Sequence, residues 1–123
     1  MPNTPDSRLR SSMRKGCVAL PGAFNGLVAR AVARAGFDGC YVSGAAVSAS
    51  YGVPDIGLAT LDVFCNVIEQ VARSSGLPVL ADADTGFGEG EELIRRVVRE
   101  YARAGAAGFH IEDQVFPKRC GHL

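Results

Sequence analysis

The sequence predicts an α/β fold built on a parallel sheet, because short apolar runs alternate with amphipathic helical segments along the chain. Four apolar runs are expected to form strands, at residues 17–20, 40–42, 78–81 and 107–111. Each run is followed by polar or small residues, and ligands collect at the carboxyl edge of parallel strands. These strands and the helices between them match the first four βα units of a (β/α)8 TIM barrel, which usually needs about 250 residues.

The amino-acid composition indicates one packed domain and argues against several kinds of partner. The 123 residues are 47% hydrophobic, which supports one packed domain. Thirteen basic and thirteen acidic side chains cancel, so neither nucleic acid nor an anionic membrane is expected as the main partner. No apolar run approaches the roughly 18 residues of a membrane span, and the N-terminus lacks a secretory-type apolar segment. We therefore expect a cytoplasmic protein, with the mitochondrial matrix as the alternative.

The first sixteen residues differ in composition from the rest of the chain. They contain prolines, serines and several basic side chains against the single acid Asp6. An organelle transit peptide and a short helix that covers one end of the domain both fit this composition. We treat residues 1–16 as an N-terminal lead-in and residues 17–123 as the barrel domain.

Three helices are expected between the strands. Asn25 can cap the first helix, and Gly36 offers a left-handed end to it. The second has apolar residues at helical spacing over residues 61–71 and ends near Gly76. The third, over residues 89–104, begins with acids and ends with a basic side chain, as the helix dipole prefers.

One of the four cysteines stands in an unusual setting. The cysteines are Cys17, Cys40, Cys65 and Cys120, and they form no CxxC pair, so neither a zinc module nor a thioredoxin-type motif is indicated. The first three lie in or beside apolar runs and are expected to be small buried hydrophobes. Cys120 instead follows Lys118 and Arg119 and precedes His122, and cationic neighbours favour the thiolate. It is a candidate for proton transfer or nucleophilic work, and the alternative is a solvated basic loop with an incidental cysteine.

Acids at the strand ends form a candidate metal site. Asp82 and Asp84 stand two residues apart at the end of the third strand, so both are expected on one face, where their charges repel. Carboxylate oxygens of this kind suit Mg²⁺ or Mn²⁺. Asp55 in a Gly/Pro loop and Glu112 at the fourth strand tip would strengthen this interpretation if they converge there. The alternative is a pair of solvated loop acids or a helix cap.

Three further positions carry candidate polar groups. Small residues from Ser43 to Ala46 follow the second strand, which leaves backbone N–H groups open to an anionic ligand. His110 lies within the fourth strand and is expected to be a structural, hydrogen-bonded imidazole. His122 stands two residues after Cys120 and either polarises the thiol or binds a substrate anion.

Taken jointly, the motifs resemble one known family. They are, in chain order, Leu20-Pro21-Gly22-Ala23-Phe24, Val42-Ser43-Gly44, Gly52-Val53-Pro54-Asp55-Ile56-Gly57, Asp82-Ala83-Asp84-Thr85-Gly86-Phe87-Gly88, Gly105-Ala106-Ala107-Gly108, His110-Ile111-Glu112-Asp113-Gln114 and Lys118-Arg119-Cys120-Gly121-His122. This series resembles the isocitrate lyase and phosphoenolpyruvate mutase superfamily, and within it the short methylisocitrate lyases. The last motif is generally lacking in members that act on phosphorus–carbon bonds, so it favours carbon–carbon cleavage.

The resemblance implies a (β/α)8 barrel that uses Mg²⁺, or Mn²⁺, and splits 2-methylisocitrate into pyruvate and succinate by retro-aldol chemistry. The implied partner is a small 2-hydroxy di- or tricarboxylate substrate, and the full-length enzyme is expected to be a homotetramer. A related lyase or decarboxylase that acts on oxaloacetate, a dialkylmalate or isocitrate is the alternative.

The resemblance also implies roles for individual residues. Metal-binding acids would be Asp82 and Asp84, supported by Asp55 and Glu112. Groups that contact substrate would be Ser43, Gly44, Ala45, Cys120 and Gly121. Catalytic groups would be Cys120, Lys118, His122 and the aromatic Tyr41. Many relatives have a glycine where this chain has Ala45.

The sequence also raises the question of completeness. It ends at Leu123, directly after the thiol motif, whereas the family draws further substrate-binding groups from the second half of the barrel. We therefore expect a fragment or truncated product with little activity alone. The other possibility is a non-catalytic half barrel that associates with itself or a partner, because its strand edges would be open.

Overall fold

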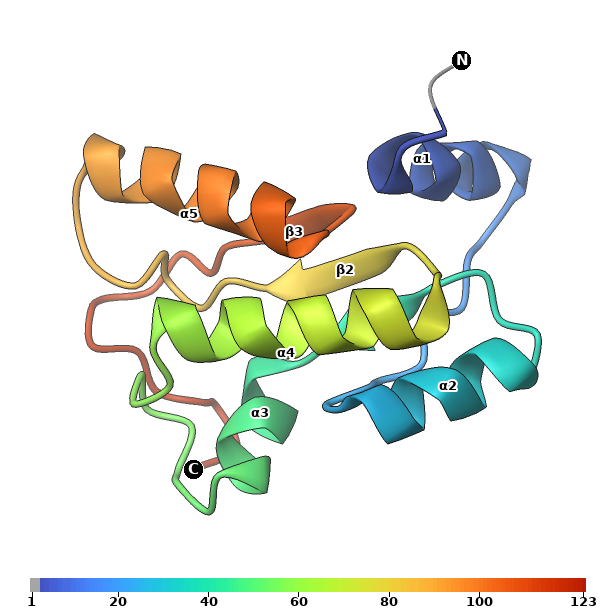
Figure 1. Ribbon diagram of the computed structural model, residues 1–123. Helices are drawn as coiled ribbons and strands as arrows, with labels where there is room; N and C mark the ends of the chain where they lie inside the picture. Colours follow the sequence, from blue (N-terminus) through green and yellow to red (C-terminus); the bar gives the residue numbers. More distant parts are fainter. Residues whose placement is uncertain (1–2) are drawn as a thin grey trace.

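A computed structural model describes residues 3–123, and in this range the chain forms five helices and three strands (Figure 1). The helices are α1 (Pro5–Lys15), α2 (Gly26–Arg34), α3 (Gly44–Ser50), α4 (Leu61–Ser75) and α5 (Glu91–Ala104). The strands are β1 (Cys40–Val42), β2 (Val79–Asp82) and β3 (Gly108–His110). They pair in the order β1-β2-β3, and both pairs are parallel, which confirms the predicted α/β class.

The two faces of the sheet differ in what covers them. Helices α2, α4 and α5 lie side by side along one face (Figure 1). Alternate strand residues point toward these helices and are fully buried, namely Cys40, Val42, Val79 and Ala81. Phe64 and Ile68 of α4 complete the core against them. By the same alternation the other face carries Tyr41, Asp82 and His110, so the polar groups gather on the side that these helices leave uncovered.

The first expected strand is the main error in the predicted topology. Residues 17–20 are not a strand, and the only pairing near them, within the described chain, is a parallel bridge between Gly22 and Tyr41. The Tyr41 N–H donates to the Pro21 carbonyl, and Ala23 N–H donates to that of Tyr41. Pro21 has no N–H for the next rung upstream, so the ladder stops there.

Helix α3 was not predicted, because its small residues were interpreted as an anion-binding turn. The Ser43 Oγ accepts a hydrogen bond from the Ala46 N–H at 3.3 Å and so caps the helix. A serine before an alanine-rich stretch was the signal available in the sequence. Helix α5 begins at Glu91 rather than residue 89, because Gly88 and Gly90 have φ values of 141° and 101°, outside the helical region.

The lead-in contains helix α1, as one of its two interpretations expected. Leu9 is buried, and Arg8 Nη1 donates to the Gly76 carbonyl at 2.9 Å, just before β2. This contact places α1 against the amino end of the sheet, opposite the edge where the acids lie (Figure 1). Among residues 3–123, no helix combines the length and apolar character needed to cross a membrane.

Candidate active site

The carboxylate of Asp82, the last residue of β2, is held by the local backbone. Its Oδ1 accepts from the Asp84 N–H at 2.9 Å, and its Oδ2 accepts from the Gly44 N–H at 3.0 Å. The Tyr101 hydroxyl of α5 donates to the Asp82 carbonyl at 2.7 Å. The strand end is therefore fixed from α3 and from α5, and no pattern in the sequence indicates this role for Tyr101.

Asp82 and Asp84 converge on one point, but not through the strand geometry that the sequence predicted, because Asp84 lies beyond β2 in a turn with a φ of 45°. A Cβ atom added to Gly44 would lie 2.6 Å from Asp82 Oδ2 and 2.9 Å from Asp84 Oδ1. Both side chains are almost completely buried, with residue exposures of 5% and 3%. Two carboxylates so close in a low-dielectric setting need a compensating cation.

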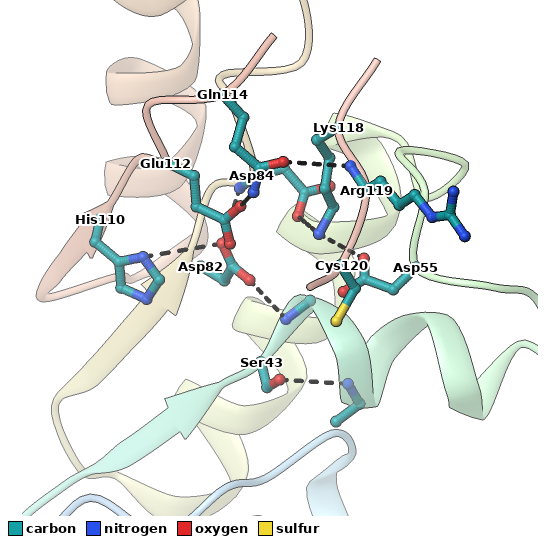
Figure 2. Close-up of polar contacts among 12 residues, drawn as sticks. Ser43, Asp55, Asp82, Asp84, His110, Glu112, Gln114, Lys118, Arg119 and Cys120 are labelled. Carbon is teal, nitrogen blue, oxygen red and sulfur yellow. Dashed lines mark hydrogen bonds and ion pairs between the residues drawn. The ribbon is translucent and has the colours of Figure 1, made fainter. Parts of the chain in front are cut away.

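Lys118 supplies positive charge to this cluster. Its Nζ lies 2.6 Å from Asp55 Oδ1 and 3.0 Å from Asp84 Oδ1, and its side chain is only 2% exposed (Figure 2). Burial alone would lower the pKa of Lys118, but hydrogen bonds and charges from the two aspartates outweigh it and raise that pKa. For Asp84, burial is the larger effect and raises its pKa despite the ammonium. Lys118 is thus a permanent cation that joins the segment around Cys120 to the acids.

The acids retain capacity for a further cation. Asp84 Oδ1 is buried and accepts no well-directed hydrogen bond from residues 3–123, although Lys118 lies nearby. In the described chain, no three His, Cys, Asp or Glu side chains are arranged as a complete metal-binding group. Mg²⁺ commonly binds through one or two carboxylates and keeps several waters. The paired oxygens of Asp82 and Asp84 therefore fit such an ion.

Glu112 stands beside the two aspartates at the end of β3 (Figure 2). Its N–H donates to the Asp84 carbonyl at 2.7 Å, which holds the segment after β3 against the turn after β2. Its carboxylate accepts a hydrogen bond from Gln114 Nε2. The structure thus brings Asp55, Asp82, Asp84 and Glu112 to one edge of the sheet.

The Cys120 loop, residues 118–122, lies over this edge. The Cys120 N–H donates to the Asp55 carbonyl at 3.0 Å, and Cys120 Sγ lies 3.7 Å from His122 Nδ1. The thiol group was expected between cations on both sides. Instead the Lys118 ammonium is committed to the aspartates and the Arg119 guanidinium points away from the acids (Figure 2), so His122 is the neighbour of the thiol. Gly121 is exposed and separates the two.

Tyr41 and His110 form a pair on the open face of the sheet. The Tyr41 hydroxyl and His110 Nε2 are 2.7 Å apart, and the rings stack with centroids 5.7 Å apart. His110 Nδ1 lies 4.0 Å from Asp82 Oδ1. Burial, and then the charge of Asp82, raise the pKa of Tyr41. The expected hydrogen-bonded imidazole is confirmed, but its side chain is 45% exposed and it holds the hydroxyl of Tyr41.

The residues from Ser43 to Ala45 are less open than the sequence suggested. The Gly44 N–H is already engaged by Asp82, and Ser43 Oγ accepts the capping bond of α3. Ala45 is exposed at the start of the helix. Gly44 therefore contributes mainly by its missing side chain, which leaves room for the carboxylates.

The cysteines differ in burial. All four are free thiols: Cys40 is buried, Cys65 and Cys120 are partly buried, and Cys17 is exposed. The prediction of a buried Cys17 was wrong, because residues 17–20 do not join the sheet. Burial raises the pKa of Cys40, and it is also the largest cause of the raised pKa of Cys65.

Thiol modification should follow this order. At pH 8 we expect iodoacetamide to label Cys17 and Cys120 in the native protein well before Cys65 and Cys40, because a raised pKa lowers the thiolate fraction and burial blocks access. Peptide mass spectrometry over time measures the four rates. Unfolding in urea is the control and should make them similar. Native labelling of Cys40 as fast as of Cys17 would contradict the structure.

Comparison with known proteins gives a consistent result. The family model described as phosphoenolpyruvate phosphomutase matches residues 9–122. A probable 2-methylisocitrate lyase 2 of Corynebacterium glutamicum is 58% identical over 104 residues, covering 85% of this chain and 34% of its own. The chain thus spans about a third of the length of that relative.

Solved structures agree with the sequence match. The crystal structure of phosphoenolpyruvate phosphomutase from Streptomyces platensis subsp. rosaceus superposes with a TM-score of 0.91 at 40% identity, over 96% of this chain and 41% of that one. A phosphonopyruvate hydrolase in complex with oxalate and Mg²⁺ superposes with a TM-score of 0.87 at 35% identity, over 94% and 41%. With the fold, the acid cluster and the family match in agreement, this chain belongs to the phosphoenolpyruvate mutase and isocitrate lyase superfamily.

Proposed function

We propose that this chain carries the acid cluster and thiol loop of a Mg²⁺-dependent carbon–carbon lyase that splits 2-methylisocitrate into pyruvate and succinate. The observation that carries the proposal is the docking of the Cys120 loop on the acids through Asp55 and Asp84. The high identity to a probable 2-methylisocitrate lyase supports the choice of substrate. In this proposal residues 17–123 form the first half of a (β/α)8 barrel, and the whole enzyme is a homotetramer.

The acids would hold the metal at the carboxyl edge of the sheet. Asp82 and Asp84 would contact it, and Asp55 and Glu112 would support the metal and its waters. When bound, Mg²⁺ supplies Lewis-acid polarisation of a substrate oxygen. Mn²⁺ suits the same oxygen ligands.

The protein groups then account for the proton and charge balance. Cleavage of the bond next to the hydroxyl-bearing carbon turns that carbon into the carbonyl of pyruvate. The hydroxyl proton passes to solvent, from which the Cys120 thiolate regains a proton after the reaction. The electron pair of the broken bond stays on the succinate fragment, which must gain a proton. The Cys120 thiol would donate it, with His122 at 3.7 Å placed to share the charge of the resulting thiolate.

Other residues would bind and enclose the substrate. Ser43, Gly44 and Ala45 lie where β1 meets α3, at the carboxyl edge of the sheet, and would line the position of a substrate carboxylate, with the Gly44 N–H kept on Asp82. Tyr41, fixed by His110, would face the reacting carbons from the open side of the sheet. Gly121 would let the loop move and exclude water when it closes.

Replacement of Cys120 by Ser tests the proposed mechanism. The 123 residues alone are expected to show little turnover. In an enzyme with the complete barrel and Mg²⁺ present, we expect Cys120→Ser to lower pyruvate release from 2-methylisocitrate at least about 100-fold, because a hydroxyl is a far weaker acid at this position. A coupled lactate dehydrogenase assay measures pyruvate, and calorimetry checks that substrate still binds. Cys17→Ser, at an exposed thiol, is the matched control. Unchanged turnover in Cys120→Ser would remove the thiol from the mechanism.

The same acid and thiol groups would serve other 2-hydroxy acids or oxo acids, so substrate identity needs its own assay. Oxaloacetate, 2,3-dimethylmalate and isocitrate are the competing substrates, as for a related lyase or decarboxylase. A panel of the four compounds under identical conditions ranks them by kcat/KM. We expect 2-methylisocitrate to rank first.

A further inference from the structure

Gln114 links the acid cluster to the thiol loop through its side chain. Its Nε2 donates to Glu112 Oε2, and its Oε1 accepts the backbone N–H of Arg119 at 3.3 Å (Figure 2). One partner lies at the end of β3, and the other directly precedes Cys120. The side chain therefore spans the turn between the two.

The two partners require an amide. A carboxylate such as that of Glu112 accepts hydrogen bonds, and a backbone N–H such as that of Arg119 donates. The donor end of Gln114 must face the first and the acceptor end the second, which fixes the orientation of the amide. Glutamate has no donor, lysine has no acceptor and methionine provides neither at useful strength.

The other loop contacts reach different acids. Lys118 Nζ and the Cys120 N–H bind Asp55, and Lys118 also reaches Asp84. Gln114 adds the connection to Glu112. The docked loop is thus tied to three of the acids that surround the proposed cation position.

We propose that Gln114 is a positioning residue that holds the Glu112 carboxylate and the docked Cys120 loop in fixed positions relative to each other. The inference rests on the proposed function for the roles of Glu112 and Cys120. A cation that orders Glu112 then favours the docked loop, and a docked loop favours cation binding by the same factor, because such coupling is reciprocal.

The test replaces Gln114 by Met, which keeps the length and removes both polar contacts. Gln70→Met, on the exposed surface of α4, is the matched control. Amide hydrogen exchange by NMR measures docking at the Cys120 N–H, which is bonded to Asp55 rather than to Gln114. Calorimetric titration with Mn²⁺ measures the acid site. Gln114→Asn is a second variant, because its shorter side chain cannot span both partners.

We expect Gln114→Met and Gln114→Asn to speed exchange of the Cys120 N–H about fivefold and to weaken Mn²⁺ binding about fivefold, the scale of one net hydrogen bond. The melting temperatures of the two Gln114 variants should equal that of Gln70→Met, which would show that they lose positioning and not the fold. Exchange and affinity equal to the control would overturn the proposal, as would faster exchange with unchanged affinity. If the unchanged protein binds no Mn²⁺, the metal part of the proposed function fails and with it the joint role of Gln114.

Discussion

Replacing Lys118 by Met is expected to destabilise the protein by about 3 kcal/mol, the usual cost of removing one partner of a buried ion pair. The Lys118, Asp55 and Asp84 side chains are 2%, 12% and 5% exposed, so solvent cannot replace the lost ammonium. The two carboxylates would stay buried without a counter-charge. Urea unfolding followed by circular dichroism gives the free energy of unfolding for the variant and the parent.

Lys15→Met is the matched control, because Lys15 is exposed at the end of α1 and its loss should change stability by less than about 0.5 kcal/mol. Added Mg²⁺ should restore part of the stability of Lys118→Met, since a cation that binds the folded state shifts the equilibrium toward it. Equal stability of the two lysine variants would show that the buried ion pair does not form in solution.

The second large effect is expected for Gly44→Ala. The new Cβ would lie 2.6 Å from Asp82 Oδ2 and 2.9 Å from Asp84 Oδ1, so the carboxylates must move apart. Overpacking of this kind costs about 2 kcal/mol. We also expect Mn²⁺ affinity, and lyase turnover in an enzyme with the complete barrel, to fall at least about tenfold, because the oxygens that would bind the ion are the ones displaced. Thermal melting and Mn²⁺ calorimetry measure the two effects.

Gly22→Ala controls for the loss of a glycine beside the sheet. No atom lies within 4 Å of a Cβ added at Gly22, and its φ is not in the left-handed region. This variant should keep both the melting temperature and the cation affinity of the parent. A Gly44→Ala protein that binds Mn²⁺ as tightly as Gly22→Ala would exclude the aspartate pair as the cation site.

Local pattern was sufficient for most of the fold. Three of the expected strands and all three expected helices are present, within one or two residues at most ends. The first strand failed because Pro21 lacks the donor that continued pairing needs, and α3 was missed because small residues also suit an anion-binding turn. The missing N–H of Pro21 decided the first case, and the side-chain cap from Ser43 Oγ to the Ala46 N–H decided the second.

The amino-acid pattern alone was enough to locate the edge where the site lies and the acids that meet there. The DAD triplet placed both acids at the end of β2, and parallel strands brought Glu112 to the same edge, although Asp84 lies beyond the strand with a φ of 45° rather than in strand geometry. The partners of these acids became known from the folded chain, in which Lys118 lies between Asp55 and Asp84, and Gln114 donates to Glu112. This is because the end of a strand is set by local backbone geometry, whereas the direction of a long side chain is set by charges and hydrogen-bond partners that only the folded chain brings within reach.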